Sequence, residues 1–310
     1  MAGSSSTVCD PELVLAHKFP ETVFNYTERD VALYALGVGS CIGNAVEEKE
    51  LKYVYHGNGQ QFLQVLPTFA ALFPFGILSH LHQVEGLQFD PRLLLHGQQY
   101  IEIFKPLPSR SSIQNRTVIS GLHDKGKATV VEIETMSYNK ETGEALCMNQ
   151  SSIYLRGAGG FSKFNPLYSY SKYPANQVSG VNIPKTSPFS VYEESTSQSQ
   201  ALLYRLSGDY NPLHSDPMVA GVAGFSRPIL HGLCTLGFAV RAVIKCICNG
   251  DAALVKCILG RFLLHVYPGE TLITKMWLDG LKVLFVMIVK ERNRSVLSGY
   301  VVLNHRPSSL

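Results

Sequence analysis

The chain has 310 residues, of which 45% are hydrophobic, and its formal net charge is +3. This length accommodates two domains with substantial cores, while so small a charge, scattered along the chain, argues against binding of nucleic acid. No apolar run is long enough to span a membrane, and the small polar start from Met1 to Asp10 is unlike a signal peptide.

The cysteines are odd in number and form no Cys-x-x-Cys pair. They are Cys9, Cys41, Cys147, Cys234, Cys246, Cys248 and Cys257. We therefore expect neither a disulfide framework nor a metal site, but buried thiols in a reducing compartment.

The first half of the chain has an apolar segment followed by strands. The segment from Val65 to Leu78 is the helix candidate of this half. Three strands are predicted after it, at roughly 115–122, 126–138 and 143–155, and Gly143 marks the hairpin turn before the last of them. Residues from Gly157 to about Pro184 are rich in Ser, Tyr, Asn and Pro, which is typical of a linker over the surface.

The second half shows the same order of elements. An apolar helix begins at Gly232, and strands are predicted at roughly 255–264, 270–279 and 282–303, the last interrupted by a turn at Asn293. Ala32-Leu-Tyr-Ala-Leu36 also resembles Leu202-Leu-Tyr-Arg-Leu206, which indicates two diverged copies of one unit. We predict an α+β fold with units at 1–160 and 185–310, joined by a linker at 161–184.

The run from Gly208 to Asp216 is a polar turn that places Asp209, Asn211 and His214 within six residues. Asp209 and His214 could meet on one water molecule, as general acid–base chemistry requires. Taken singly, Asp209 or Asn211 is explained as well by turn chemistry, but the ensemble favours a catalytic site. The backbone N–H of Gly232, at the start of a helix, is a ready donor to a developing oxyanion.

Neighbouring polar residues have a structural explanation. Asp216 is expected to cap a short helix over 218–223, with Pro217 in its first turn. His231 either orients the Gly232 peptide or is a core histidine, and the core role is favoured. Cys234 lies in an apolar helix and is expected to be inert.

These residues resemble the type 2 enoyl-CoA hydratases, a MaoC-like family, most closely its stand-alone peroxisomal form in plants. The resemblance runs from about residue 15 to residue 303. Besides the polar turn it rests on Pro228-Ile-Leu-His-Gly232, Tyr34-Ala-Leu-Gly-Val-Gly39, Leu66-Pro-Thr-Phe69, Leu94-Leu-His-Gly-Gln-Gln-Tyr100, Lys105-Pro-Leu-Pro108, Asp124-Lys-Gly126 and Tyr267-Pro-Gly-Glu-Thr271.

The resemblance implies a double hot dog, two repeats of a long central helix wrapped by an antiparallel sheet. It also implies hydration of trans-2-enoyl-CoA to (3R)-3-hydroxyacyl-CoA, and the reverse reaction, in fatty acid β-oxidation without a cofactor. Asp209, Asn211, His214 and Gly232 would be catalytic. The first half would hold the acyl chain, with Val65–Leu78 lining a slot or serving as plain core. Substrate-binding roles are implied for His96, Gly97, Gln98, Lys125, Arg156, Gly157, Gly208 and Leu213.

Other functions remain open at this point. A hot-dog acyl-CoA thioesterase would cleave the thioester, and an acyl-CoA-binding protein would need no intact polar turn. A dehydratase acting on acyl carrier protein is a closer neighbour. The terminal Ser308-Ser-Leu310 resembles a peroxisomal address read by the import receptor, which favours CoA and a peroxisomal location. The resemblance also suggests a homodimer.

Overall fold

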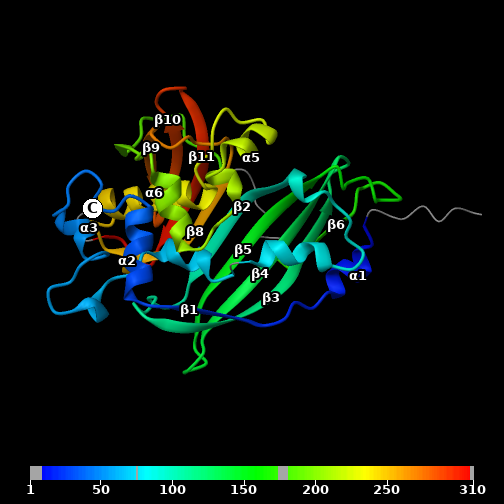
Figure 1. The fold of residues 1–310 in the computed structure, drawn as a ribbon, viewed down its shortest axis with the longest axis horizontal. Helices are drawn as coiled ribbons and strands as arrows, with labels where there is room; N and C mark the ends of the chain where they lie inside the picture. The colour runs from blue at the N-terminus through cyan, green and yellow to red at the C-terminus, as the bar shows by residue number, and fades with distance from the viewer. Residues whose placement is uncertain (1–8, 75, 174–180, 308–310) are drawn as a thin grey trace, which may run out of the picture.

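The computed structural model describes residues 9–74, 76–173 and 181–307 and contains one continuous antiparallel sheet of eleven strands (Figure 1). The strands are ordered β1-β3-β4-β5-β2-β8-β11-β10-β9-β7, with β6 paired to β3 beside this path. Their bounds are β1 Thr22–Tyr26, β2 Leu94–Ile103, β3 Ser111–Asp124, β4 Ala128–Asn139, β5 Ala145–Arg156, β6 Ser169–Ser171, β7 Ser190–Ser195, β8 Val255–Phe262, β9 Thr271–Asp279, β10 Lys282–Val289 and β11 Arg294–Leu303.

Helices are short, apart from one. The α-helices are α1 Pro11–Ala16, α2 Glu28–Gly37, α3 Glu48–Leu51, α4 Gln200–Tyr204, α5 Pro217–Val222 and α6 Gly232–Cys246. The 3₁₀ turns are η1 Gln60–Phe62, η2 Pro67–Leu72, η3 Ile77–Gln83, η4 Pro91–Leu93, η6 Arg205–Ser207, η7 Pro212–His214 and η8 Ala252–Leu254. None of the helices in the described ranges is both long and apolar enough to cross a membrane.

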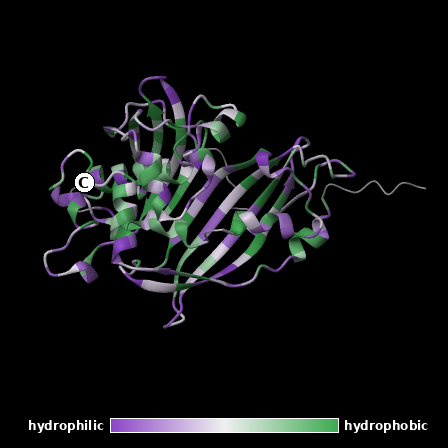
Figure 2. Ribbon diagram, viewed as in Figure 1, coloured by the Kyte–Doolittle hydropathy of each residue, from purple (hydrophilic) through white to green (hydrophobic). Residues whose placement is uncertain are grey.

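Helix α6 is the centre of the second half. Every residue from Cys234 to Ile244 is buried, and Figure 2 shows mainly hydrophobic residues along it. Strands β7–β11 and the first-half turn η2 contact this helix. A helix that is apolar on all sides is stable only when other elements surround it, and here the curved sheet does so. The predicted helix beginning at Gly232 is confirmed.

The part of the first half that the structure describes does not contain the predicted second central helix. Within 65–74 and 76–78 the chain forms 3₁₀ turns instead of an α-helix. Pro74 has no N–H for helical bonding, and Gly76 adopts a left-handed conformation with φ of 85°; both interrupt an α-helix. The expectation of two long central helices is therefore wrong, although η2 packs where such a helix would lie.

The predicted strands are confirmed as β3–β5 and β8–β11. Gly143 and Asn293 lie in the hairpin turns, with φ of 72° and 47° respectively. The sequence did not indicate β1, β6 or β7, which are short strands of three to six residues. Strand β6 lies inside the predicted linker, where Ser171 Oγ donates to buried Glu132 at 2.7 Å, so part of the linker is fastened to the first-half sheet.

Two of the contacts between the halves join corresponding elements of the repeats. Strands β2 and β8 pair directly, with Gln98 opposite Arg261, and so join the halves into one sheet. Helices α2 and α4, which carry the two similar Leu-Tyr sequences, also pack together, with the Tyr34 and Tyr204 ring centroids 6.0 Å apart. The related tyrosines thus face each other across the junction of the repeats.

Candidate active site

The polar turn folds as a compact loop because of its glycine and asparagine. Gly208 has φ of 125°, a conformation that side-chain-bearing residues rarely adopt. Asn211 caps η7 by accepting a hydrogen bond from the Leu213 N–H at 3.0 Å, and the Asp209 carboxylate accepts one from the Asn211 N–H at 3.2 Å. These local bonds set the directions in which Asp209 and His214 leave the backbone.

His214 is held in one tautomer. Its Nδ1–H donates to the Ile229 carbonyl at 2.8 Å, because a carbonyl oxygen can only accept. The Nε2 atom is therefore free to accept a proton. Burial, the main cause, lowers the pKa of His214 below its ordinary value of 6.5, so the imidazole is neutral near pH 7. Nε2 of His214 is therefore the atom that can act as a base.

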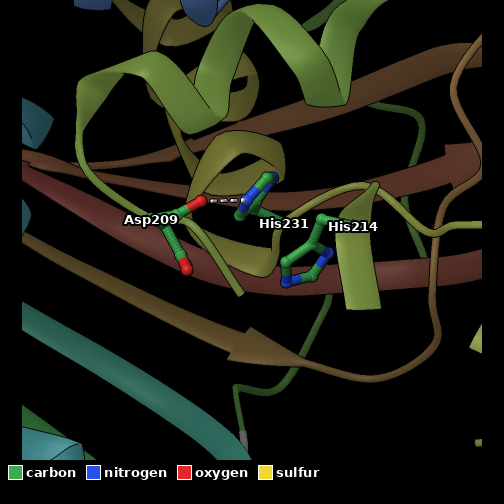
Figure 3. A group of neighbouring side chains, drawn as sticks. All are labelled: Asp209, His214 and His231. Atoms are coloured by element: carbon green, nitrogen blue, oxygen red, sulfur yellow. Dashed lines mark hydrogen bonds between the residues drawn. The ribbon is translucent and has the colours of Figure 1, made fainter. Parts of the chain in front are cut away.

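Asp209 lies next to this base. Side-chain atoms of Asp209, His214 and His231 that could each bind a ligand all lie within 4.8 Å of one another, and Figure 3 shows the Asp209 carboxylate and the His214 ring bordering one space. Two groups this close can bind one water between them. The structure therefore brings together the two residues that the sequence proposed as an acid–base pair.

The same three side chains do not form a metal site. The His214 and His231 rings are stacked, with centroids 3.7 Å apart and planes 28° apart, so their lone pairs run side by side instead of converging. His231 Nε2 also donates to the main-chain carbonyl of Asp209 at 3.2 Å. A first-row metal needs ligand atoms that point to a common centre.

Gly232 is the first residue of α6, as predicted, and its N–H has no partner within the helix. A Cβ atom built on Gly232 would lie 3.2 Å from the Phe262 ring, tighter than an ordinary contact. The His96 ring packs edge-on against the same Phe262, with centroids 5.1 Å apart. Phe262, which sequence analysis missed, thus links the helix start to the first half of the chain.

Three of the other candidate binding residues, His96, Gly97 and Gln98, lie near the start of β2. His96 Nε2 contacts the Gln98 carbonyl at 3.0 Å across a bulge in the strand, and a Cβ on Gly97 would clash with the Tyr154 ring at 2.5 Å. Burial lowers the pKa of His96 to about 4. Gly208 and Leu213 belong to the polar turn itself.

Lys125, Arg156 and Gly157 lie at the same end of the first-half sheet. Arg156 Nε donates to the Leu93 carbonyl at 3.2 Å, just before β2, and the Gly157 N–H donates to the Lys127 carbonyl at 2.8 Å. Lys125 lies in the turn between β3 and β4. These three residues are far apart in the sequence. They share the end of the sheet at which β2 begins, and β2 runs from there towards Phe262 and Gly232.

Comparisons with known proteins point to one family. Residues 24–157 match the family model "MFE-2 hydratase 2 N-terminal domain", and residues 180–299 match "MaoC like domain". "Enoyl-CoA hydratase 2, peroxisomal" from Arabidopsis thaliana is 59% identical over 307 residues, covering 99% of both chains. "Peroxisomal multifunctional enzyme type 2" from Mus musculus is 40% identical over 93% of this chain and 38% of its own length.

Solved structures show the same architecture. A MaoC-like dehydratase from Phytophthora capsici has a TM-score of 0.82 and 34% identity, with 96% of this chain and 98% of that chain covered. A Mycobacterium tuberculosis protein described as having a double hot dog fold covers 92% of this chain and 96% of its own, with a TM-score of 0.55. At 13% identity the latter likeness shows the fold alone, and that fold is the predicted double hot dog.

Proposed function

The chain belongs to the MaoC-like enoyl-CoA hydratase 2 family, and from this premise we propose that it adds water to trans-2-enoyl-CoA in peroxisomal fatty acid β-oxidation. The product is (3R)-3-hydroxyacyl-CoA, and the reverse dehydration uses the same groups. The observation that carries this proposal is the free Nε2 of neutral His214 beside the Asp209 carboxylate. No step requires a cofactor.

The proposed hydration consumes one water. One proton moves from this water to His214, and one then moves from His214 to the substrate. His214 Nε2 takes a proton from the water as the water oxygen bonds to C3 of the enoyl group. Negative charge develops on the thioester oxygen, where the Gly232 N–H stabilises it. The resulting imidazolium, stabilised by the Asp209 carboxylate, returns a proton to C2 on the same face. Asn211 helps to fix the position of the water or of the acyl portion.

The decisive assay uses the pure protein and a medium-chain trans-2-enoyl-CoA. Loss of enoyl absorbance, followed by oxidation of the product by a dehydrogenase specific for (3R)-hydroxyacyl-CoA, supports the proposal. Oxidation by a (3S)-specific enzyme contradicts the stereochemistry. Release of free thiol without hydration indicates a thioesterase, and binding without turnover indicates an acyl-CoA-binding protein. A clear preference for acyl carrier protein over CoA overturns the substrate class.

The pH dependence of kcat/KM follows from the state of His214. The mechanism needs the neutral ring, and its protonated fraction grows as pH falls through the pKa. Because burial lowers that pKa below 6.5, we expect kcat/KM to stay level from about pH 8 down to the ordinary histidine range and to fall only below it. If kcat/KM already falls on the acid side at a pH above 6.5, this assignment is contradicted.

The first half is proposed to bind the acyl chain. A cavity of about 360 Å³ lies at the junction of the halves, with Val65, Ile103 and Val255 in its wall. It lies at the β8 end opposite Phe262, which is about 20 Å away at the rise of a β-strand. Only the tail of a long acyl chain could reach it. Most of the other described residues of 65–78 are buried, as expected of a plain core segment.

Val65→Trp is therefore expected to raise KM for long-chain substrates about tenfold and to leave crotonyl-CoA within about twofold, because a filled cavity excludes a tail and spares the reacting carbons. Steady-state kinetics over a chain-length series measures this. Exposed Val46→Trp on the first-half surface is the matched control. Equal losses for short and long chains would place the acyl chain elsewhere.

Capture by the peroxisomal import receptor stays a prediction, since Ser308-Ser309-Leu310 lies outside the described residues. A fluorescent fusion at the N-terminus should overlap a peroxisomal marker, and deletion of Leu310 should make it cytosolic.

The proposed homodimer is checked by light scattering after gel filtration.

A further inference from the structure

His231 makes two contacts with the catalytic pair, although nothing in the proposed reaction uses it directly. Its Nε2–H donates to the main-chain carbonyl of Asp209 at 3.2 Å, and its ring stacks on His214 with centroids 3.7 Å apart. Figure 3 shows the ring next to both residues, with the hydrogen bond to the main-chain oxygen of Asp209 drawn as a dashed line. His231 is 1% exposed and immediately precedes Gly232, so it touches or adjoins all the principal reacting groups.

We infer that His231 is a positioning residue of this centre: it fixes the main chain that carries Asp209, supports the His214 ring, and sets where Gly232 begins α6. The inference rests on the proposed hydratase function and extends it to a residue for which a plain core role was expected. A core histidine needs only a satisfied ring, whereas this ring leaves Nδ1 buried without a partner among the described residues and uses Nε2 on the catalytic loop.

The surroundings keep His231 neutral, so that a proton taken up by either of the two stacked histidines resides on His214. The groups that face His231 are His214, Asp209, Arg205 and, through an aromatic contact with centroids 4.8 Å apart, Tyr204. Burial, and then the nearby His214 and Arg205, lower the pKa of His231 to about 2 despite the carbonyl of Asp209. Among the titratable groups, Asp209 raises the pKa of His214, against the larger effect of burial.

Two polar substitutions separate positioning from core packing. The amide nitrogen of glutamine can occupy the place of His231 Nε2 and reach the Asp209 carbonyl, whereas that of asparagine is too short. We expect His231→Gln to keep kcat within about tenfold of the wild type and His231→Asn to lose about 100-fold, the scale of a misplacement of 1 Å, with KM changed less than about threefold in both. Equal kcat values in the two variants overturn the inference.

His123 provides the matched control. It is a buried histidine in the first half, hydrogen-bonded through Nδ1 to Ser169 at 2.7 Å and through Nε2 to Glu132 at 3.2 Å. His123→Gln and His123→Asn remove comparable buried contacts away from the centre, and we expect both to leave kcat within about threefold of the wild type. A drop in kcat for His123→Asn as large as for His231→Asn assigns the effect to general loss of packing and overturns the inference.

NMR spectroscopy provides a test that does not depend on hydratase activity. In ¹⁵N-histidine NMR of the wild type, we expect His231 as the neutral Nε2–H tautomer from about pH 5 to pH 9, while His214 is Nδ1–H when neutral. Titration of His231 in this window, or an Nδ1–H tautomer, overturns the inference. A wild type without hydratase activity would refute the proposed function alone, since the NMR result still decides whether His231 is placed as described.

Discussion

Asp209→Ala and His214→Ala are each expected to lower kcat about 10³-fold or more, within the range that general acid–base groups contribute. Because the two residues act on one water, loss of either disables the same step. Effects of residues that act as a unit are far from additive, so the double variant should be little worse than either single one. Initial rates with a medium-chain trans-2-enoyl-CoA measure all three.

The fold should survive these changes. Among the described residues, the Asp209 side chain makes one hydrogen bond, to the Asn211 N–H, and the His214 ring makes one, to the Ile229 carbonyl. Asp216→Ala is the matched control, because this carboxylate lies in the same loop but caps α5 by accepting from the Met218 N–H at 2.8 Å. Loss of a cap costs about 1 kcal/mol of stability and should leave kcat near the wild-type value. Near-wild-type turnover in either single variant removes that residue from the mechanism.

The largest expected effect on stability comes from Arg241→Leu. Arg241 is 1% exposed in the middle of α6 and pairs with Glu50 of α3 and Glu194 of β7, while its Nε donates to the Val38 carbonyl at 2.9 Å. It therefore joins the second-half helix to the first half of the chain. Removing it deprives two buried carboxylates of their closest cation, although Glu50 keeps the Cys41 N–H at 2.9 Å and Lys245 at 3.6 Å. Breaking a buried ion pair in this way costs about 3–5 kcal/mol of the free energy of unfolding.

Urea unfolding at neutral pH measures this change. Burial already raises the pKa of Glu194, and loss of the Arg241 charge should raise that pKa further. A carboxyl whose pKa is raised in the folded state destabilises it at higher pH, so the deficit of the variant should shrink as pH falls towards about 5. Changing Glu50 and Glu194 to glutamine in the Arg241→Leu background should recover part of the loss.

The neighbouring surface pair provides the contrast. Lys290 Nζ donates to Glu193 at 2.5 Å, and both side chains are about half exposed. Water screens such a pair, so Lys290→Ala should leave the urea midpoint almost unchanged. A loss below about 1 kcal/mol for Arg241→Leu would mean that the two buried carboxylates find other partners.

Local sequence determined the polar turn and most of the strands. Gly208 and Asn211 specify their loop by φ preference and by capping, and Gly232 follows a non-helical His231 into an apolar run that can only be a buried helix. Strands β3–β5 and β8–β11 were readable because hairpin signals such as Gly143 and Asn293 act between residues close in the chain. These features needed no partner from elsewhere in the molecule.

Contacts between distant segments decided the rest. Val65–Leu78 is apolar enough for a helix, but it packs as 3₁₀ turns against α6, where Pro74 and Gly76 prevent a regular helix. In the sequence, Arg241 is an isolated charge in an apolar run, and only the fold brings Glu50 and Glu194 into contact with it. Likewise no local signal shows that His231 would donate to the Asp209 carbonyl and stack on His214. Burial and hydrogen-bond partners are properties of the packed chain, so a residue's role can depend on neighbours that the sequence places far away.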